Sequence, residues 1–206
     1  MGRPHGTIRA VTSPLPRTLE AARAAEHRGD RLRYLCFWGH QPRRDGSISA
    51  ECLSQWWPAP FTVDGITYAT AEHWMMAGKA RLFGDNSMAE RILSTPHPRA
   101  VKALGRRISG FDENAWQAHR YPLVVTGSIA KFDQNPDLRA FLLATARRVL
   151  VEASPVDRVW GIGLAATDPG AERPSQWLGL NRRRRFSRWF LRSRSRWSKC
   201  VGRIRG

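Results

Sequence analysis

A carboxylate and an amine lie seven residues apart, at Glu72 and Lys79, in a segment rich in helix-forming residues. In an α-helix, seven residues at ~100° each return nearly to the starting azimuth, with ~10 Å of axial rise between the two side chains. This spacing leaves room for a sugar-sized ligand between carboxylate and ammonium. Two ordinary roles stay open, because the helix dipole favours a glutamate in the first turn and a lysine is usually solvated.

The residues around this pair predict a hairpin followed at once by a helix. Residues 61–68, Phe-Thr-Val-Asp-Gly-Ile-Thr-Tyr, place Asp-Gly between two apolar, β-branched runs, which is a strong signal for a two-residue hairpin turn. Thr70 is a suitable N-cap, and the residues after it favour a helix to about Arg81 despite Gly78. An aromatic strand pair therefore directly precedes the helix that carries both candidate side chains.

Several separated motifs follow one another between Tyr34 and Asn181. They are Pro-Phe-x-x-Asp-Gly-x-x-Tyr-x-Thr-x-Glu-His at 60–73, Lys-Ala at 79–80, Lys-Ala-Leu-Gly-Arg at 102–106, Lys-Phe at 131–132, Leu-Val-Glu-Ala-Ser-Pro-Val-Asp at 150–157 and Trp-Gly-Ile-Gly at 160–163. In this order they resemble the YbiA-like (NADAR) family of N-glycosidases. The resemblance implies a single α+β, mostly helical domain with a small β-sheet.

The same resemblance implies an activity, the hydrolysis of a ribosyl C1′–N bond without a metal or organic cofactor. The expected partner is a phosphorylated ribosylamine. For some members this is an early riboflavin-pathway ribosylamino-pyrimidine phosphate, and for others it is ADP-ribosylated guanine. Both substrate classes stay open for this sequence.

Cleavage of a ribosyl C–N bond passes through a cation at C1′, so the site needs a carboxylate, an activated water and a donor for the departing base. We predict Glu72 as the first carboxylate. Asp157 is predicted as a second carboxylate or as an acceptor for a ribose hydroxyl, with an Asx-type turn as its alternative role. Lys79, partly desolvated, would have a lowered pKa and could exchange with a ring-opened imine at C1′, or it could bind a phosphate.

The sequence also predicts groups that hold the substrate. Trp160-Gly161 offers an indole for stacking beside a backbone that a ligand can approach closely, although an ordinary core tryptophan is the alternative. His40, at the end of a predicted strand, could point into a site or merely pack. The basic candidates for a phosphate are Lys102, Arg106 and Lys131, and the remaining candidates for substrate contacts are Trp74 and Asn181.

We divide the chain into a flexible N-terminal arm at 1–31, the YbiA-like domain at 32–181 and an Arg-rich tail at 182–206. The arm holds one short helical segment, at 19–27. Pro122 is expected to break the helix in which it lies. The local patterns predict strands at 34–38 and 149–153, and helices at 98–107, at 116–131 and from Asn135-Pro136 to about Arg147.

Charge is unevenly distributed along the chain. The formal net charge is +17, but residues 182–206 contribute +11 and leave only +6 for the rest. A modestly cationic body suits a protein that binds phosphorylated small molecules, whereas a tail of arginines with interleaved Trp and Phe supports an alternative, a non-catalytic nucleic-acid-binding protein. The tail departs from the family pattern after Asn181. A change of reading frame, which would weaken or abolish activity, and a genuine basic tail are the two explanations.

Composition fits one domain with a real core, at 206 residues and 42% hydrophobic residues. Three scattered cysteines, Cys36, Cys52 and Cys200, predict reduced thiols because they suit neither a disulfide framework nor a CxxC metal site. No apolar run approaches the ~20 residues that span a membrane, and the N-terminus lacks an apolar signal region. We therefore expect a cytoplasmic protein.

Overall fold

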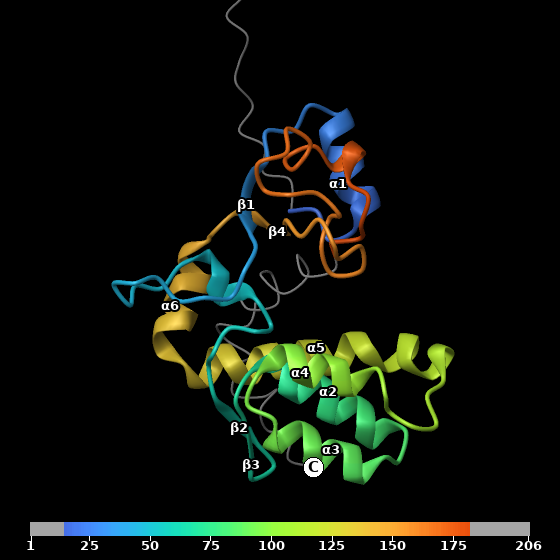
Figure 1. The fold of residues 1–206 in the computed structure, drawn as a ribbon. Coiled ribbons are helices and arrows are strands. Elements are labelled where there is room, and N and C mark those ends of the chain that lie inside the picture. Colours follow the sequence, from blue (N-terminus) through green and yellow to red (C-terminus); the bar gives the residue numbers. More distant parts are fainter. Residues whose placement is uncertain (1–14, 182–206) are drawn as a thin grey trace, which may run out of the picture.

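The structure, a computed structural model, describes residues 15–181. Figure 1 shows helices α2 to α5 gathered on one side, and α1 with the paired strands β1 and β4 on the other. The fold is α+β and mostly helical, as predicted. Its elements are α1 (Leu19–His27), β1 (Arg33–Phe37), η1 (Ala50–Leu53), β2 (Phe61–Val63), β3 (Ile66–Tyr68), α2 (Ala71–Leu82), α3 (Asn86–Ser94), α4 (Pro98–Gly105), α5 (Glu113–Gln134), α6 (Pro136–Ala144), β4 (Arg148–Glu152) and η2 (Pro174–Gln176).

The β-structure of residues 15–181 consists of two separate strand pairs. Strands β2 and β3 form the predicted antiparallel hairpin, and β1 pairs in parallel with β4, from Arg33 opposite Arg148 to Phe37 opposite Glu152. Strand β4 lies between two cores, since Val149 and Val151 join one apolar cluster and Leu150 joins another. Both ends of the described chain therefore contribute to one parallel pair.

The hairpin and the helix after it confirm the local reading of the sequence. Asp64 and Gly65 have φ of 51° and 75°, the left-handed values that a two-residue hairpin turn requires. The Thr70 side chain accepts a hydrogen bond from the His73 backbone N–H, so Thr70 caps α2, which runs to Leu82. Local turn chemistry and capping are enough to set these boundaries.

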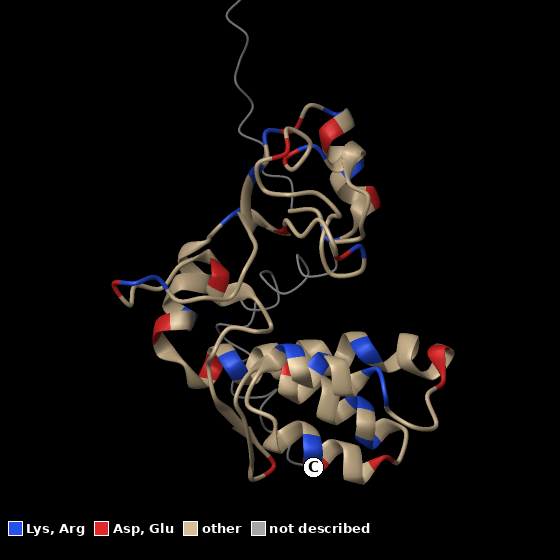
Figure 2. Ribbon diagram, in the orientation of Figure 1, with Lys and Arg blue, Asp and Glu red and all other residues tan. Residues whose placement is uncertain are grey.

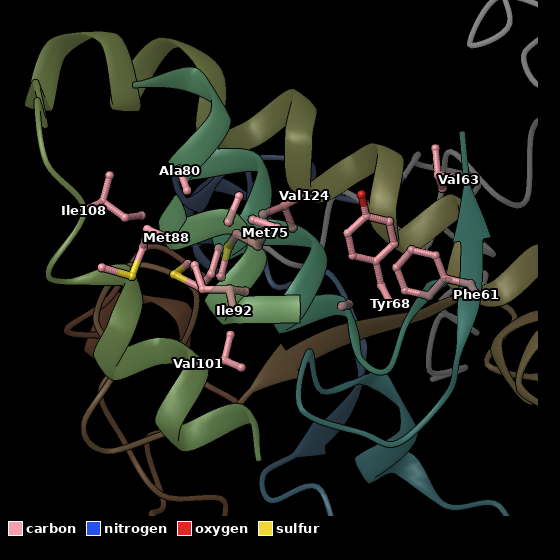
Figure 3. Packing of buried hydrophobic residues seen from close by; sticks show 14 residues of the cluster. Phe61, Val63, Tyr68, Met75, Ala80, Met88, Ile92, Val101, Ile108 and Val124 are labelled. Carbon is pink, nitrogen blue, oxygen red and sulfur yellow. The ribbon is translucent and has the colours of Figure 1, made fainter. Parts of the chain in front are cut away.

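Helix α2 is the centre of the helical side and packs against α3, α4 and α5. Figure 3 shows Phe61 and Tyr68 of the hairpin next to each other, and Met75 of α2, Ile92 and Val101 belong to the same cluster. Small residues allow these close approaches. A Cβ on Gly78 would come within 2.7 Å of Leu123, and one on Gly105 within 2.1 Å of the Met76 sulfur.

Two local predictions differ from the structure. Helix α5 continues through Pro122, because Pro122 and Ala118, whose carbonyl loses its donor, are both exposed to solvent. Helix α6 ends at Ala144 rather than near Arg147, since Ala146 adopts a left-handed φ of 49°.

The arm also differs from its predicted flexible state. Helix α1 has the predicted bounds but is docked, with Leu19, Ala22 and Ala25 buried. The Arg23 guanidinium donates to the Pro174 and Trp177 carbonyls, at 3.1 and 3.3 Å. From Leu19 onward, the arm is therefore part of the folded body.

Residues 1–14 and the Arg-rich tail, with Cys200 and both explanations for the tail, lie outside the described residues. Cys36 and Cys52 are free thiols. Within residues 15–181, no helix is both long and apolar enough to cross a membrane.

Candidate active site

A cleft of about 710 Å³ lies where the carboxyl ends of β1 and β4 face the helical side. Parallel strands commonly place a ligand at this end, because the loops that leave them diverge. One wall comes from residues 37–40 and 152–160, and the other from α2, α4 and α5. The volume is in the usual range for a nucleotide-sized ligand. Five of the predicted site residues line it: His40, Glu72, Lys102, Asp157 and Trp160.

Glu72 is the most buried carboxylate of the cleft, at 3% exposure. Its backbone N–H donates to the Gln55 carbonyl at 3.0 Å, which fixes the start of α2 against the loop before β2. The adjacent His73 faces away, with its Nε2–H donating to the Thr95 carbonyl at 2.8 Å. Burial lowers the pKa of His73, and its bond to Thr95 opposes this. His73 thus anchors the helix while Glu72 faces the cleft.

Asp157 combines a turn with a place in the cleft wall. Its Oδ1 accepts hydrogen bonds from the backbone N–H groups of Val159 and Trp160, at 2.9 and 2.8 Å. This is the Asx-type turn that the sequence allowed as an alternative. The turn presents Trp160 to the cleft, so Asp157 shapes the wall in which it lies.

A basic and aromatic cluster forms one side of the cleft around Trp56. The His40 ring packs edge-on against Trp56, with 5.2 Å between the ring centroids, and the Lys102 Nζ lies 5.9 Å from the centroid of the same indole. The ring centroids of His97 and His40 are 6.4 Å apart. Burial lowers the pKa of His40, and the nearby His97 and Arg99 lower it further. A phosphate placed here would meet the Lys102 ammonium beside the Trp56 indole and the Arg99 guanidinium three residues away on the same helix.

Lys79 is not among the residues that line the cleft. Its amine donates to the Gly105 carbonyl at 2.8 Å and lies over the Phe111 ring, 4.1 Å from the centroid. Burial lowers its pKa, as expected, while Glu113 acts in the opposite direction. The Trp116 ring, which does line the cleft, is 5.5 Å from the amine. The predicted shared face therefore runs from the cleft at Glu72 to the contact with α4 at Lys79.

Three more predicted binding residues also lie away from the cleft lining. The Trp74 indole N–H donates to the Leu123 carbonyl at 2.8 Å and packs between α2 and α5. Lys131 is 1% exposed, and its amine donates to the carbonyls of Cys52 and Ser54, both at 2.7 Å. Arg106 is the exposed C-cap of α4. Trp74 and Lys131 therefore make structural contacts, and Arg106 lies at the end of a helix, away from the cleft.

Gly161 and Asn181 lie behind the cleft wall rather than in it. A Cβ on Gly161 would come within 2.7 Å of the Asp157 carbonyl and 2.9 Å of the Glu152 carbonyl, so only glycine fits. Asn181 is fully buried, and its side chain bonds to the backbone of β4. Both residues hold the 152–161 segment in place.

Comparison with known proteins assigns this chain to a family. Residues 36–183 match the model of the NADAR domain. The chain belongs to the NADAR family. It is 38% identical over 154 residues to an N-glycosidase of Acanthamoeba polyphaga mimivirus, which covers 72% of this chain and 89% of that relative. It is 36% identical over 104 residues to the N-glycosidase YbiA of Escherichia coli, spanning 50% of this chain and 63% of YbiA.

A solved structure shows the same fold. The NMR structure of Escherichia coli YbiA aligns with a TM-score of 0.58 and 24% sequence identity, over 84% of this chain and 89% of that one. At this identity, the likeness supports the NADAR fold alone.

Within residues 15–181, no three His, Cys, Asp or Glu side chains are grouped to hold a metal ion.

The NADAR cleft also contains residues that the sequence did not single out. The sequence contains a feature that could have identified Glu152, since it is the one acid of the apolar run 149–153. Arg99 could have been identified because it lies three residues before Lys102 on the same helix face. The remaining polar and aromatic members come together only in the folded chain, and they are Phe37, Trp38, Ser54, Trp56, Trp116, Arg120, Ser154 and Arg158.

Proposed function

We propose that this NADAR protein is an N-glycosidase that hydrolyses the ribosyl C1′–N bond of a phosphorylated N-riboside. The observation that carries the proposal is the buried Glu72 carboxylate in a nucleotide-sized cleft that Arg99 and Lys102 also line. A buried carboxylate is held ready to stabilise positive charge that develops on a sugar, because little water screens it. The N-glycosidase names of the relatives support the same class of reaction.

In the proposed reaction, the C1′–N bond breaks with its electron pair moving to nitrogen, a water oxygen bonds to C1′, and one proton of that water ends on the departing nitrogen. Glu72 stabilises the cationic C1′ between these events, and Asp157 accepts a hydrogen bond from a ribose hydroxyl. Trp160 and Trp116 provide aromatic surfaces for the base. Lys102 and Arg99 of α4 hold a phosphate beside Trp56.

For the substrate, we favour an early riboflavin-pathway ribosylamino-pyrimidine phosphate, which has one phosphate for the cluster at Trp56. The second candidate is ADP-ribosylated guanine. Arg158 lines the wall contributed by residues 152–160, whereas Arg99 and Lys102 lie on α4, so a diphosphate could contact cations from both walls. A side-by-side hydrolysis assay on the two substrates, with full-length protein and with protein truncated before Arg182, decides between them.

The same assay tests the active-site carboxylate. Glu72→Gln keeps the shape of the side chain but removes its charge, so kcat should fall by about 10²-fold or more with folding preserved. Glu90→Gln is the matched control, because Glu90 is exposed on α3 outside the cleft. A Glu72→Gln rate within threefold of the parent would remove Glu72 from the mechanism. Nucleic-acid binding that is lost on truncation, without hydrolysis of either substrate, would favour the non-catalytic alternative.

A further inference from the structure

Within residues 15–181, no strand pairs with the edge of β4 that faces away from β1, and the Asn181 side chain bonds to this edge. Its Oδ1 accepts a hydrogen bond from the Glu152 backbone N–H at 3.2 Å, and its Nδ2 donates to the Leu150 carbonyl at 3.1 Å. In a parallel ladder, a residue on a neighbouring strand makes this same pair of bonds to the two residues that flank its partner. The Asn181 carboxamide therefore takes the place of a peptide group from a third strand.

The position is built for an asparagine. Asn181 is fully buried and has a φ of 43°, a left-handed conformation that asparagine and glycine tolerate better than other residues. Its own N–H donates to the Gly161 carbonyl at 3.1 Å. Two residues earlier, a Cβ on Gly179 would come within 2.3 Å of that carbonyl, so the backbone approach is close. With the backbone held by these contacts, the carboxamide points toward β4.

The residue held most directly is Glu152. Its N–H bonds to Asn181, its carbonyl accepts from the Ile162 N–H at 2.9 Å, and the next N–H, of Ala153, donates to the Phe37 carbonyl at 2.9 Å. The backbone around Glu152 is thus held from both edges of β4. Glu152 also lines the cleft. As a residue it is partly exposed, whereas Glu72 is buried, although the Glu152 Oε2 atom is itself enclosed.

We propose that Glu152 is the base that receives the proton of the attacking water, and that Asn181 is its positioning residue. This proposal rests on the proposed N-glycosidase function. The water oxygen bonds to C1′ as the C1′–N bond breaks, the water proton moves to the Glu152 carboxylate, and it passes from there to the departing nitrogen. Glu72 keeps the separate task of stabilising the cation. Asn181 acts through the backbone of Glu152, without touching substrate.

Asn181→Gly tests the positioning role, because glycine accepts the left-handed φ but has no carboxamide. We expect kcat to fall by about tenfold or more while KM stays within about threefold, since the Asp157 turn that presents Trp160 does not involve the Asn181 side chain. Asn181→Asp keeps the bond to the Glu152 N–H but places an oxygen against the Leu150 carbonyl, so it should not rescue the rate. An unchanged kcat in Asn181→Gly would overturn the proposal.

A double-mutant cycle separates positioning from general loss of stability. If Asn181 acts through Glu152, Asn181→Gly should cost no further rate once Glu152→Gln is present. Thr145→Val is the matched control, since Thr145 is fully buried outside the cleft and donates to the Leu142 carbonyl at 2.7 Å. Its small effect should be the same with and without Glu152→Gln. Full additivity of Asn181→Gly with Glu152→Gln would contradict the proposal.

Amide hydrogen exchange gives a readout that needs no activity. In Asn181→Gly, the Glu152 amide should exchange at least about tenfold faster, whereas the Ala153 amide, bonded to β1, should keep its protection. If the parent protein hydrolyses neither substrate, the proposed function fails, and the exchange pattern still decides whether Asn181 holds Glu152. Equal protection of the Glu152 amide in parent and variant would refute that contact.

Discussion

A substitution at Lys131 tests whether this lysine is structural or binds a phosphate. Its buried amine makes two charged hydrogen bonds, each 2.7 Å long, to the carbonyls of Cys52 and Ser54. Lys131→Met keeps most of the apolar stem but leaves both carbonyls without this donor. At about 1.5–3 kcal/mol for each charged bond, the loss is about 3–6 kcal/mol, and relief from burying an ammonium offsets part of it. We expect the free energy of unfolding to fall by about 2–4 kcal/mol.

Urea denaturation of parent and variant, followed by tryptophan fluorescence and by circular dichroism, measures this change. Lys102→Met is the control on an accessible lysine of the cleft, and its effect on the free energy of unfolding should stay below about 1 kcal/mol. Because Ser54 and Trp56 follow the anchored carbonyl of Cys52 and line the cleft, Lys131→Met should also lower kcat. Unchanged stability together with a KM raised tenfold would refute the structural reading and return Lys131 to the phosphate site.

Two further predictions concern the other lysines and Arg106. Lys79→Arg keeps a cation beside the Phe111 ring, so kcat should stay within about threefold, and borohydride added during turnover should trap no ribosyl adduct on Lys79. A trapped adduct with loss of turnover in Lys79→Arg would instead establish the covalent route. Lys102→Ala should raise KM for a phosphorylated substrate by about tenfold, whereas Arg106→Ala, at the end of the same helix, should leave KM unchanged. The reverse order would move the phosphate to Arg106.

The fold was predictable where the signal is local. The Asp64-Gly65 turn and the Thr70 cap fix the hairpin and the start of α2 through residues that are neighbours in sequence. The parallel pairing of β1 with β4 has no such signal, because more than a hundred residues separate the strands. The predicted helix break at Pro122 was wrong for a related reason, since only the folded chain shows that this side of α5 faces solvent.

The site was predictable in part, for the same physical reason. Helical spacing correctly gives Glu72 and Lys79 a common face, but it cannot say which neighbour covers each end of that face. A lysine in a motif looks like a phosphate ligand until its carbonyl partners are seen, as with Lys131. Arg120 and Arg158 are recognised as site residues only when strand ends and helices meet around one cavity.

The docking of α1 changes what counts as the folding unit of this family member. The NADAR match begins at residue 36, yet Leu19 belongs to the same apolar cluster as Val151, Ile162 and Trp177. A fragment trimmed to the family outline would begin within β1, lose the Arg23 contacts to the segment at η2, and expose that cluster to water. The boundary that sequence families share is thus shorter than the boundary that this chain needs to enclose its own core.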